Sequence, residues 1–168
     1  MIFKPLNNHK KNIAQKLYKI WQESYIIEKE IIGAKIFPPL DRTISDFIKS
    51  KNSFYSYIEK NNLLGVIEID CRANSIHIQS LVVSPNHFRK GIASKLIDKV
   101  FTLHKSLLYT VETGNDNDPA KKLYESKGFR KVKVCMTEFG VKKIKFEKKW
   151  KKNFKIILTI IKIKVELE

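Results

Sequence analysis

The sequence predicts an α/β fold whose parallel and antiparallel strands form one mixed sheet. Short segments with alternating or continuously apolar side chains recur along the chain, as is typical of strands. In the second half, the helical segments 87–103 and 117–127 separate such strands, and crossovers of this kind imply parallel neighbours joined by right-handed connections. The 168 residues suit one domain with a single well-filled core.

The strands are predicted from period-two alternation bounded by turn residues. The pair around Asn61-Asn62 is expected to form an antiparallel hairpin, and the last two strands form another. Leu81, Val82 and Val83 are continuously apolar, which indicates burial on both faces of the sheet. The expected strands are residues 1–6, 53–60, 63–71, 75–83, 107–111, 129–136 and 141–148.

Helices are predicted where apolar side chains recur with helical spacing. The first, residues 9–32, is expected to stop at Gly33. Two prolines in FPPLDRT exclude further helix at 37–43, and Thr43 or Ser45 can cap a short helix that ends at Lys49. In the last helix Asp118 is expected to be the cap, with a proline at the first helical position.

Composition excludes several classes of protein. No apolar stretch is long enough to span a bilayer and the N-terminus lacks a signal peptide, so we expect a cytoplasmic protein. Cys71 and Cys135 do not form a disulfide framework, and the four histidines lack metal-ligand spacing, so no metal is expected. The net charge of +16 fits nucleic-acid binding, but it also fits AT-rich coding and the steering of a phosphorylated cofactor.

The segment LVVSPNHFRKGIASKL, residues 81–96, predicts a phosphate-binding turn. A buried strand ends, the chain turns, and a helix begins near Gly91, where no Cβ obstructs a ligand. The free amides of the first helical turn and the helix dipole attract anions, and Arg89 and Lys90 add two full charges. On its own, the pattern also fits an ordinary strand-to-helix crossover that happens to contain a glycine.

This segment resembles motif A of the GCN5-related N-acetyltransferase (GNAT) family, Gln/Arg-x-x-Gly-x-Gly/Ala. Gly91 and Ala93 match the last two positions, whereas Phe88 departs from the first and removes one side-chain contact to phosphate. A second segment, Asn117-Asp118-Pro119-Ala120 with Leu123-Tyr124 and Gly128-Phe129, is similar to the family's Asn-x-x-Ala-x-x-Leu-Tyr-x-x-x-Gly-Phe signature. The close resemblance covers 74–129 and implies a central mixed sheet with helices on both faces.

The resemblance also implies roles for individual residues. The strand before the turn is expected to carry a bulge, to part from its neighbour and to bind the pantetheine arm of acetyl-CoA through its backbone. Tyr124 would protonate the departing thiolate, since the reference pKa of a tyrosine, about 10, exceeds that of a thiol. The alternative for Tyr124 is a core aromatic whose hydroxyl is satisfied locally. The expected cofactor-binding residues are Leu81, Val82, Val83, Arg89, Lys90, Gly91, Ile92, Ala93, Ser94, Asn117 and Ala120.

An amine nucleophile must lose a proton, and the sequence offers several acceptors for it. Glu112, at the end of the strand between the two motifs, is the first candidate for a general base. The other candidates are Glu68, Asp70, His77, Glu23 and Glu28, each of which also fits a solvated surface position.

The expected function is therefore N-acetyl transfer from acetyl-CoA to a primary amine of a small molecule or peptide, by direct attack in a ternary complex. The acceptor pocket is expected between the first two helices and the last hairpin. Alternatives are a non-catalytic acetyl-CoA sensor and a nucleic-acid-binding protein. Residues 1–150 are expected to form the acetyltransferase domain, and 151–168 an extension that adds an edge strand or a homodimer contact.

Overall fold

The computed structural model describes residues 1–150 of the chain. The extension expected at 151–168, whether an edge strand or an oligomer contact, lies outside the described residues. The architecture below therefore concerns the part of the chain that was expected to form the domain.

Within this part, seven strands form one sheet in the order β1-β2-β3-β4-β5-β7-β6. Strands β4 and β5 pair in parallel and all other neighbours pair antiparallel, so the predicted mixed sheet is confirmed. The strands are β1 (Ile2–Leu6), β2 (Ser53–Glu59), β3 (Asn62–Cys71), β4 (Ser75–Val83), β5 (Leu108–Gly114), β6 (Arg130–Met136) and β7 (Lys142–Lys149).

The helices begin and end largely where their capping residues predict. Helix α1 is followed by Gly33 in the left-handed region, with a φ of 62°. Thr43 and Asp46 exchange side-chain and backbone hydrogen bonds in a capping box at the start of α2. The helices are α1 (Lys11–Ile31), α2 (Ile44–Lys49), α3 (Ile92–Leu103) and α4 (Asp118–Ser126), with 3-10 turns η1 (Pro38–Asp41) and η2 (Pro85–His87).

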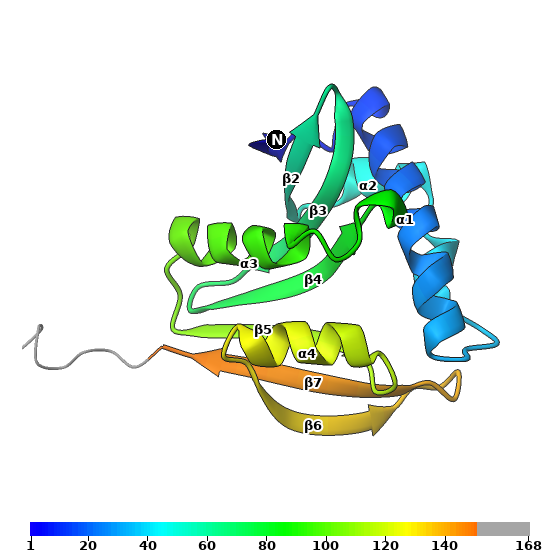
Figure 1. Cartoon of the computed structure of the whole chain (residues 1–168), viewed down its shortest axis with the longest axis vertical. Coiled ribbons are helices and arrows are strands. Elements are labelled where there is room, and N and C mark those ends of the chain that lie inside the picture. Colours follow the sequence, from blue (N-terminus) through cyan, green and yellow to red (C-terminus); the bar gives the residue numbers. More distant parts are fainter. Residues whose placement is uncertain (151–168) are drawn as a thin grey trace, which may run out of the picture.

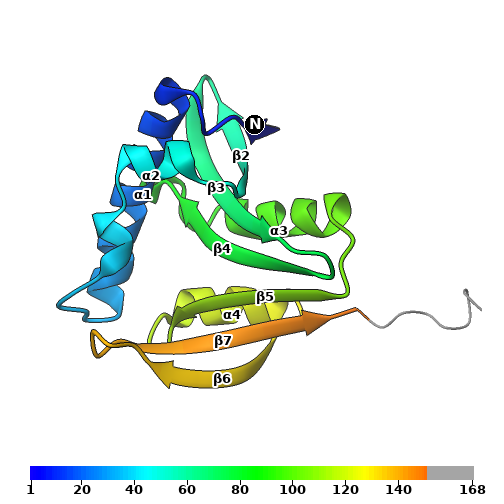
Figure 2. The same cartoon turned by 180° about the vertical axis from the view of Figure 1, so that it is seen from behind.

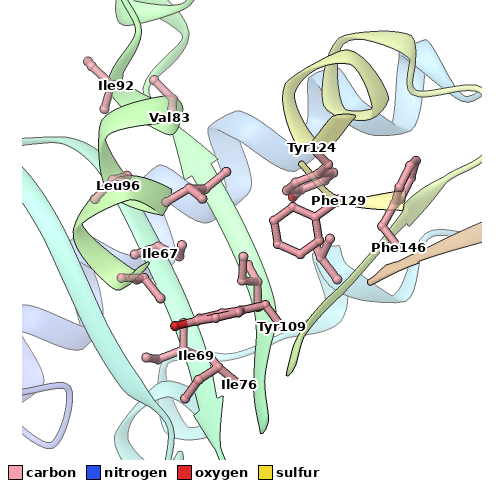
Figure 3. Close-up of a cluster of buried hydrophobic side chains, with 14 of the residues drawn as sticks. Ile67, Ile69, Ile76, Val83, Ile92, Leu96, Tyr109, Tyr124, Phe129 and Phe146 are labelled. Atoms are coloured by element: carbon pink, nitrogen blue, oxygen red, sulfur yellow. The ribbon is translucent and has the colours of Figure 1, made fainter. Parts of the chain in front are cut away.

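Helices cover both faces of the sheet (Figures 1 and 2). Helices α3 and α4 pack on one face, over a core that includes Ile67, Leu96 and Tyr109 (Figure 3). Helices α1 and α2 pack on the other face, over a second core that includes Leu17 and Phe47. Among the described residues, α1 and α2 leave β5, β7 and β6 without a helix in front of them (Figure 2). This part of the sheet is therefore open on the α1 side.

Two local predictions are corrected by the structure. Asp118 is not the cap of α4: the side chain of Asn117 accepts the capping hydrogen bond from the Ala120 amide, while Asp118 pairs with Lys121. Strand β5 continues to Gly114, because β7 pairs with it along its whole length. Within the crossover 87–103, the helix itself starts at Ile92, next to Gly91 as expected, and residues 85–87 before it form a 3-10 turn.

Candidate active site

Strands β4 and β5 part half-way along their length. Their parallel pairing covers only Ser75–Ile78 against Leu108–Val111, and beyond it the two strands diverge (Figure 2). At the same level β4 carries a bulge, since Ile78 pairs with Ile69 and Ser80 with Glu68, which leaves Gln79 without a partner on β3. The edge of β4 from Gln79 to Val83 that faces β5 therefore keeps backbone groups available, within the part of the chain that the structure describes.

The turn after β4 forms a concave arrangement of backbone amides. Gly91 is the N-cap of α3 in the left-handed region, with a φ of 73°, and a Cβ added there would meet no atom within 4 Å. Within residues 1–150, no acceptor is found for the backbone amides of residues 89–94. Consecutive free amides at a helix N-terminus bind anions, because their partial positive charges converge and the helix dipole adds to them.

Side chains around this turn are exposed and charged. Arg89 also adopts a left-handed backbone, with a φ of 62°, which for a residue with a Cβ costs about 1–2 kcal/mol. The Nζ of Lys90 donates to the backbone oxygen of Asn86 at 3.1 Å, so its charge stays close to the turn. Phe88, which departs from the motif, is 38% exposed and supplies no polar contact there.

Helix α4 brings Asn117 and Tyr124 to the side of the gap opposite α3. Tyr124 is buried and packs against Phe129 and Phe146, with ring centroids 5.7 and 6.0 Å apart (Figure 3). Its hydroxyl has no hydrogen-bond partner among residues 1–150, so the alternative of a locally satisfied core tyrosine is not what the structure shows. Burial, and next the charge of Glu28, raise the pKa of Tyr124 well above its usual range. The side chain therefore stays protonated and can donate.

A cleft of about 620 Å³ opens on the other face of the sheet, where the acceptor pocket was expected. It is lined by α1, by the 37–50 segment with α2, by β3, β4 and β5, and by the start of β7. Its aromatic wall includes Trp21, Tyr25 and Phe37. Although the chain carries a charge of +16, four carboxylates and three cationic side chains line this cleft: Glu28, Asp46, Glu68, Glu112, Arg42, Lys49 and Lys143.

Glu112 and His77 stand on the strands that part. Glu112 is exposed and lines the cleft. The Nδ1 of His77 lies 2.7 Å from the Thr110 hydroxyl, and burial lowers the pKa of this imidazole. His77 is therefore neutral at physiological pH and is held by the neighbouring strand.

Glu68 is committed to a buried ion pair. Its carboxylate binds the Arg42 guanidinium with two hydrogen bonds of 2.6 and 3.0 Å, and also accepts from Asn52 at 2.8 Å and Ser80 at 3.2 Å. The guanidinium in turn stacks on Phe47, 4.0 Å from the ring centroid. This pair fixes the FPPLDRT segment to β3, and Glu68 has no free oxygen to act as a base.

Two other candidate bases lie outside the cleft lining. The carboxylate of Asp70 pairs with Arg72 at 2.8 Å, and Glu23 lies 4.0 Å from Lys19 in an exposed pair within α1. Neither residue is among those that line the cleft.

Glu28, by contrast, lines the cleft. It lies on the face of α1 that also carries Trp21 and Tyr25 and that continues to Ile32 at the C-terminal cap, and all four residues line the cleft. Its carboxylate accepts from the Thr113 hydroxyl at 3.4 Å. The spacing 21, 25, 28, 32 is the signal that could have placed Glu28 on the cleft, since residues three and four apart share a helix face.

Comparison with known proteins assigns the chain to a family. The family model described as Acetyltransferase (GNAT) domain matches residues 30–150. The chain belongs to the GNAT acetyltransferase family. The matched range includes the parted strands, the turn at 89–94 and α4.

One curated relative is similar over most of the chain. This GNAT domain is 31% identical over 154 residues to the UPF0157 protein YqkA of Bacillus subtilis (strain 168). The aligned residues make up 91% of this chain and 45% of that relative. The chain therefore spans less than half the length of that relative.

Solved structures share the GNAT fold at low sequence identity. The ribosomal-protein-S18-alanine N-acetyltransferase of Escherichia coli superposes with a TM-score of 0.68 at 15% identity, covering 90% of this chain and 98% of its own. PaiA N-acetyltransferase of Thermoplasma acidophilum, solved with coenzyme A, gives 0.68 at 17% identity over 89% and 100%. YncA of Salmonella typhimurium, solved with its cofactor acetyl-CoA, gives 0.68 at 15% identity over 91% and 95%.

The predicted residues thus fall on two sides of one opening. The β4 edge and the turn at 89–94 lie toward α3. Asn117 caps α4, and Ala120 and Tyr124 lie within it. Glu112 lines the cleft on the opposite side of the sheet.

No helix within residues 1–150 has both the length and the apolar character needed to cross a membrane.

Proposed function

We propose that this protein transfers the acetyl group of acetyl-CoA to a primary amine of a small molecule or peptide, by direct attack within a ternary complex. One observation carries this proposal: the gap between β4 and β5 has a turn of free amides on one side and, on the other, a cleft lined by aromatic rings and by carboxylates that include Glu28 and Glu112. Two substrates that enter from opposite faces can meet in such a gap without a covalent enzyme intermediate.

The residues present fit acetyl-CoA. The amides of residues 89–94, with Arg89 and Lys90, suit a pyrophosphate, and open space at Gly91 lets a ligand approach the backbone. The unpaired β4 edge, Leu81 to Val83, can hydrogen-bond the pantetheine arm, and Asn117, the N-cap of α4, is a second contact that the sequence motif implies. Structures of similar fold have been solved with coenzyme A or acetyl-CoA, which supports the same co-substrate here.

Catalysis in this proposal depends on positioning and on two proton transfers. A β4 amide at the bulge stabilises the oxyanion that forms when the amine attacks the thioester. Tyr124 protonates the departing thiolate, and a carboxylate of the cleft accepts the proton of the amine; Glu112 on the cleft wall was the first candidate for this base from the sequence. Cys71 and Cys135 do not line the cleft, which agrees with direct attack rather than a cysteine-bound acetyl group.

Calorimetric titration with acetyl-CoA tests the co-substrate, with free CoA and ATP as controls. We expect both CoA species to bind and ATP to bind weakly. Thiol release with a panel of primary amines then tests turnover. If acetyl-CoA binds but no amine of the panel causes thiol release, the protein is an acetyl-CoA sensor and not an acetyltransferase. If neither CoA species binds, the proposal is refuted.

A further inference from the structure

Glu28 occupies a position that the roles above do not use. It sits in the last turn of α1, at the end of the cleft where β5 and the start of α4 meet. Its neighbours come from three elements: Thr113 and Gly114 at the end of β5, Asn117 at the start of α4, and Lys143 on β7. The carboxylate thus lies between the acceptor cleft and the residues assigned to the acetyl-CoA side.

The surroundings of Glu28 leave its negative charge largely unneutralised. Burial raises the pKa of its carboxyl, and hydrogen bonds from Asn117 and Thr113 offset part of that rise. Lys143 contributes a weaker attraction, and within residues 1–150 no cationic side chain forms an ion pair with Glu28. Glu68 differs: it is fully buried in the same cleft, and Arg42 binds both of its oxygens.

The charge of Glu28 also acts on two tyrosines. Burial, and next the charge of Glu28, raises the pKa of both Tyr25 and Tyr124, and Tyr25 lines the same cleft as Glu28. A half-buried, unpaired carboxylate that lies beside the Thr113 hydroxyl and is open to a cleft suits a cation that can give up a proton.

We propose that Glu28 binds the ammonium group of the acceptor and receives its proton before attack. This inference rests on the proposed acetyl transfer and names the residue that holds the acceptor nitrogen. Glu112 also lines the cleft, but it is exposed to water, where a carboxylate attracts an ammonium far more weakly.

The proton balance is complete with groups already in place. The ammonium gives one proton to a Glu28 oxygen, and the neutral amine forms a C–N bond to the acetyl carbonyl carbon. The C–S bond then breaks, Tyr124 protonates the sulfur, and the tyrosinate takes back a proton from the new amide nitrogen. Glu28 releases its proton to water when the products leave, so each acetyl transfer yields one amide, one thiol and one proton.

The test compares Glu28→Gln with Glu23→Gln, the same change on the same helix but outside the cleft lining. The probe is n-butylammonium, with n-butanol as its uncharged counterpart, added to the CoA-loaded protein in a thermal-shift measurement. We expect butylammonium to raise the melting temperature of the wild type and of Glu23→Gln, to leave Glu28→Gln unchanged, and butanol to have no effect. An equal shift in Glu28→Gln, or none in the wild type, would overturn the assignment.

Turnover gives the second readout, with the best acceptor from the amine panel. Glu28→Gln should lower kcat by about 100-fold or more, as expected for loss of a general base, and should remove the rise of kcat with pH that we expect for the wild type. Retention of that rise would also refute the role of Glu28. Absence of thiol release by the wild type would instead refute the proposed acetyl transfer, while the thermal shift still tests the ammonium site.

Discussion

Replacing Tyr124 with phenylalanine separates its proposed chemical role from its packing. The ring stays between Phe129 and Phe146, and the lost hydroxyl has no hydrogen-bond partner within residues 1–150. Removing a hydroxyl without a partner leaves no donor or acceptor unsatisfied. The free energy of unfolding should therefore change by less than about 0.5 kcal/mol.

The effect on turnover should be large. General acid catalysis contributes about 100- to 10,000-fold, so kcat at saturating substrate should fall within that range. Calorimetry should show that acetyl-CoA still binds, because the hydroxyl is needed only when the thiolate leaves.

Tyr109 provides a matched control because it is also a buried tyrosine. Its hydroxyl accepts from the Ser106 amide at 3.1 Å and donates to the backbone oxygen of His104. Tyr109→Phe leaves both groups unpaired and should reduce the free energy of unfolding by about 1–3 kcal/mol, while the folded fraction keeps its kcat. If Tyr124→Phe turns over at the wild-type rate, or if both variants lose only stability, the acid role of Tyr124 is refuted.

Three further predictions concern the amide turn, the buried ion pair and the acidic residue of α1. Gly91→Ala places a Cβ on a residue with a φ of 73°, where it meets no other atom, so the free energy of unfolding measured with denaturant should fall by about 1–2 kcal/mol. CoA should also bind more weakly in calorimetry. An unchanged CoA affinity would show that the phosphates bind elsewhere. Arg42→Met leaves the Glu68 carboxylate buried without its cation and should lower the free energy of unfolding by about 3–5 kcal/mol. The double variant Arg42→Met/Glu68→Gln should recover part of that loss. An equal loss in both variants would show that the unpaired charge of Glu68 is not the cause. The pKa of Glu28 is raised on folding, so the stability linked to its bound proton is present at low pH and is lost as pH rises through that folded pKa. Melting curves across pH should show Glu28→Gln gaining stability over the wild type above that point, and parallel curves would show that the folded and unfolded pKa values are alike.

The sequence predicts most of the architecture because the deciding signals are local. Period-two alternation marks the strands, Gly33 ends the first helix, and Thr43 with Asp46 starts α2. The cap of α4 was misplaced by one residue because Asn117 and Asp118 are both good capping residues. Only the hydrogen bond to the Ala120 amide distinguishes them.

The acceptor side of the site was less accessible to sequence reasoning. The phosphate-binding turn is one continuous segment, whereas the cleft joins residues from α1, β3, β5 and β7 that are far apart in the chain. Glu68 and Glu28 look alike in sequence, and only the fold shows that Arg42 binds Glu68 while Glu28 remains unpaired.

Gly114, at the end of β5, has a consequence for the width of the acceptor cleft. A Cβ at this position would lie 2.7 Å from the Cγ2 of Ile32, at the C-terminal cap of α1. Helix α1 can therefore rest on the backbone of β5, and this close approach sets how far Glu28 stands from the gap between the strands. Any larger residue at 114 would act as a spacer that lifts the helix end, so the absence of one side chain limits the width of the cleft and thereby the size of a ligand that it can hold.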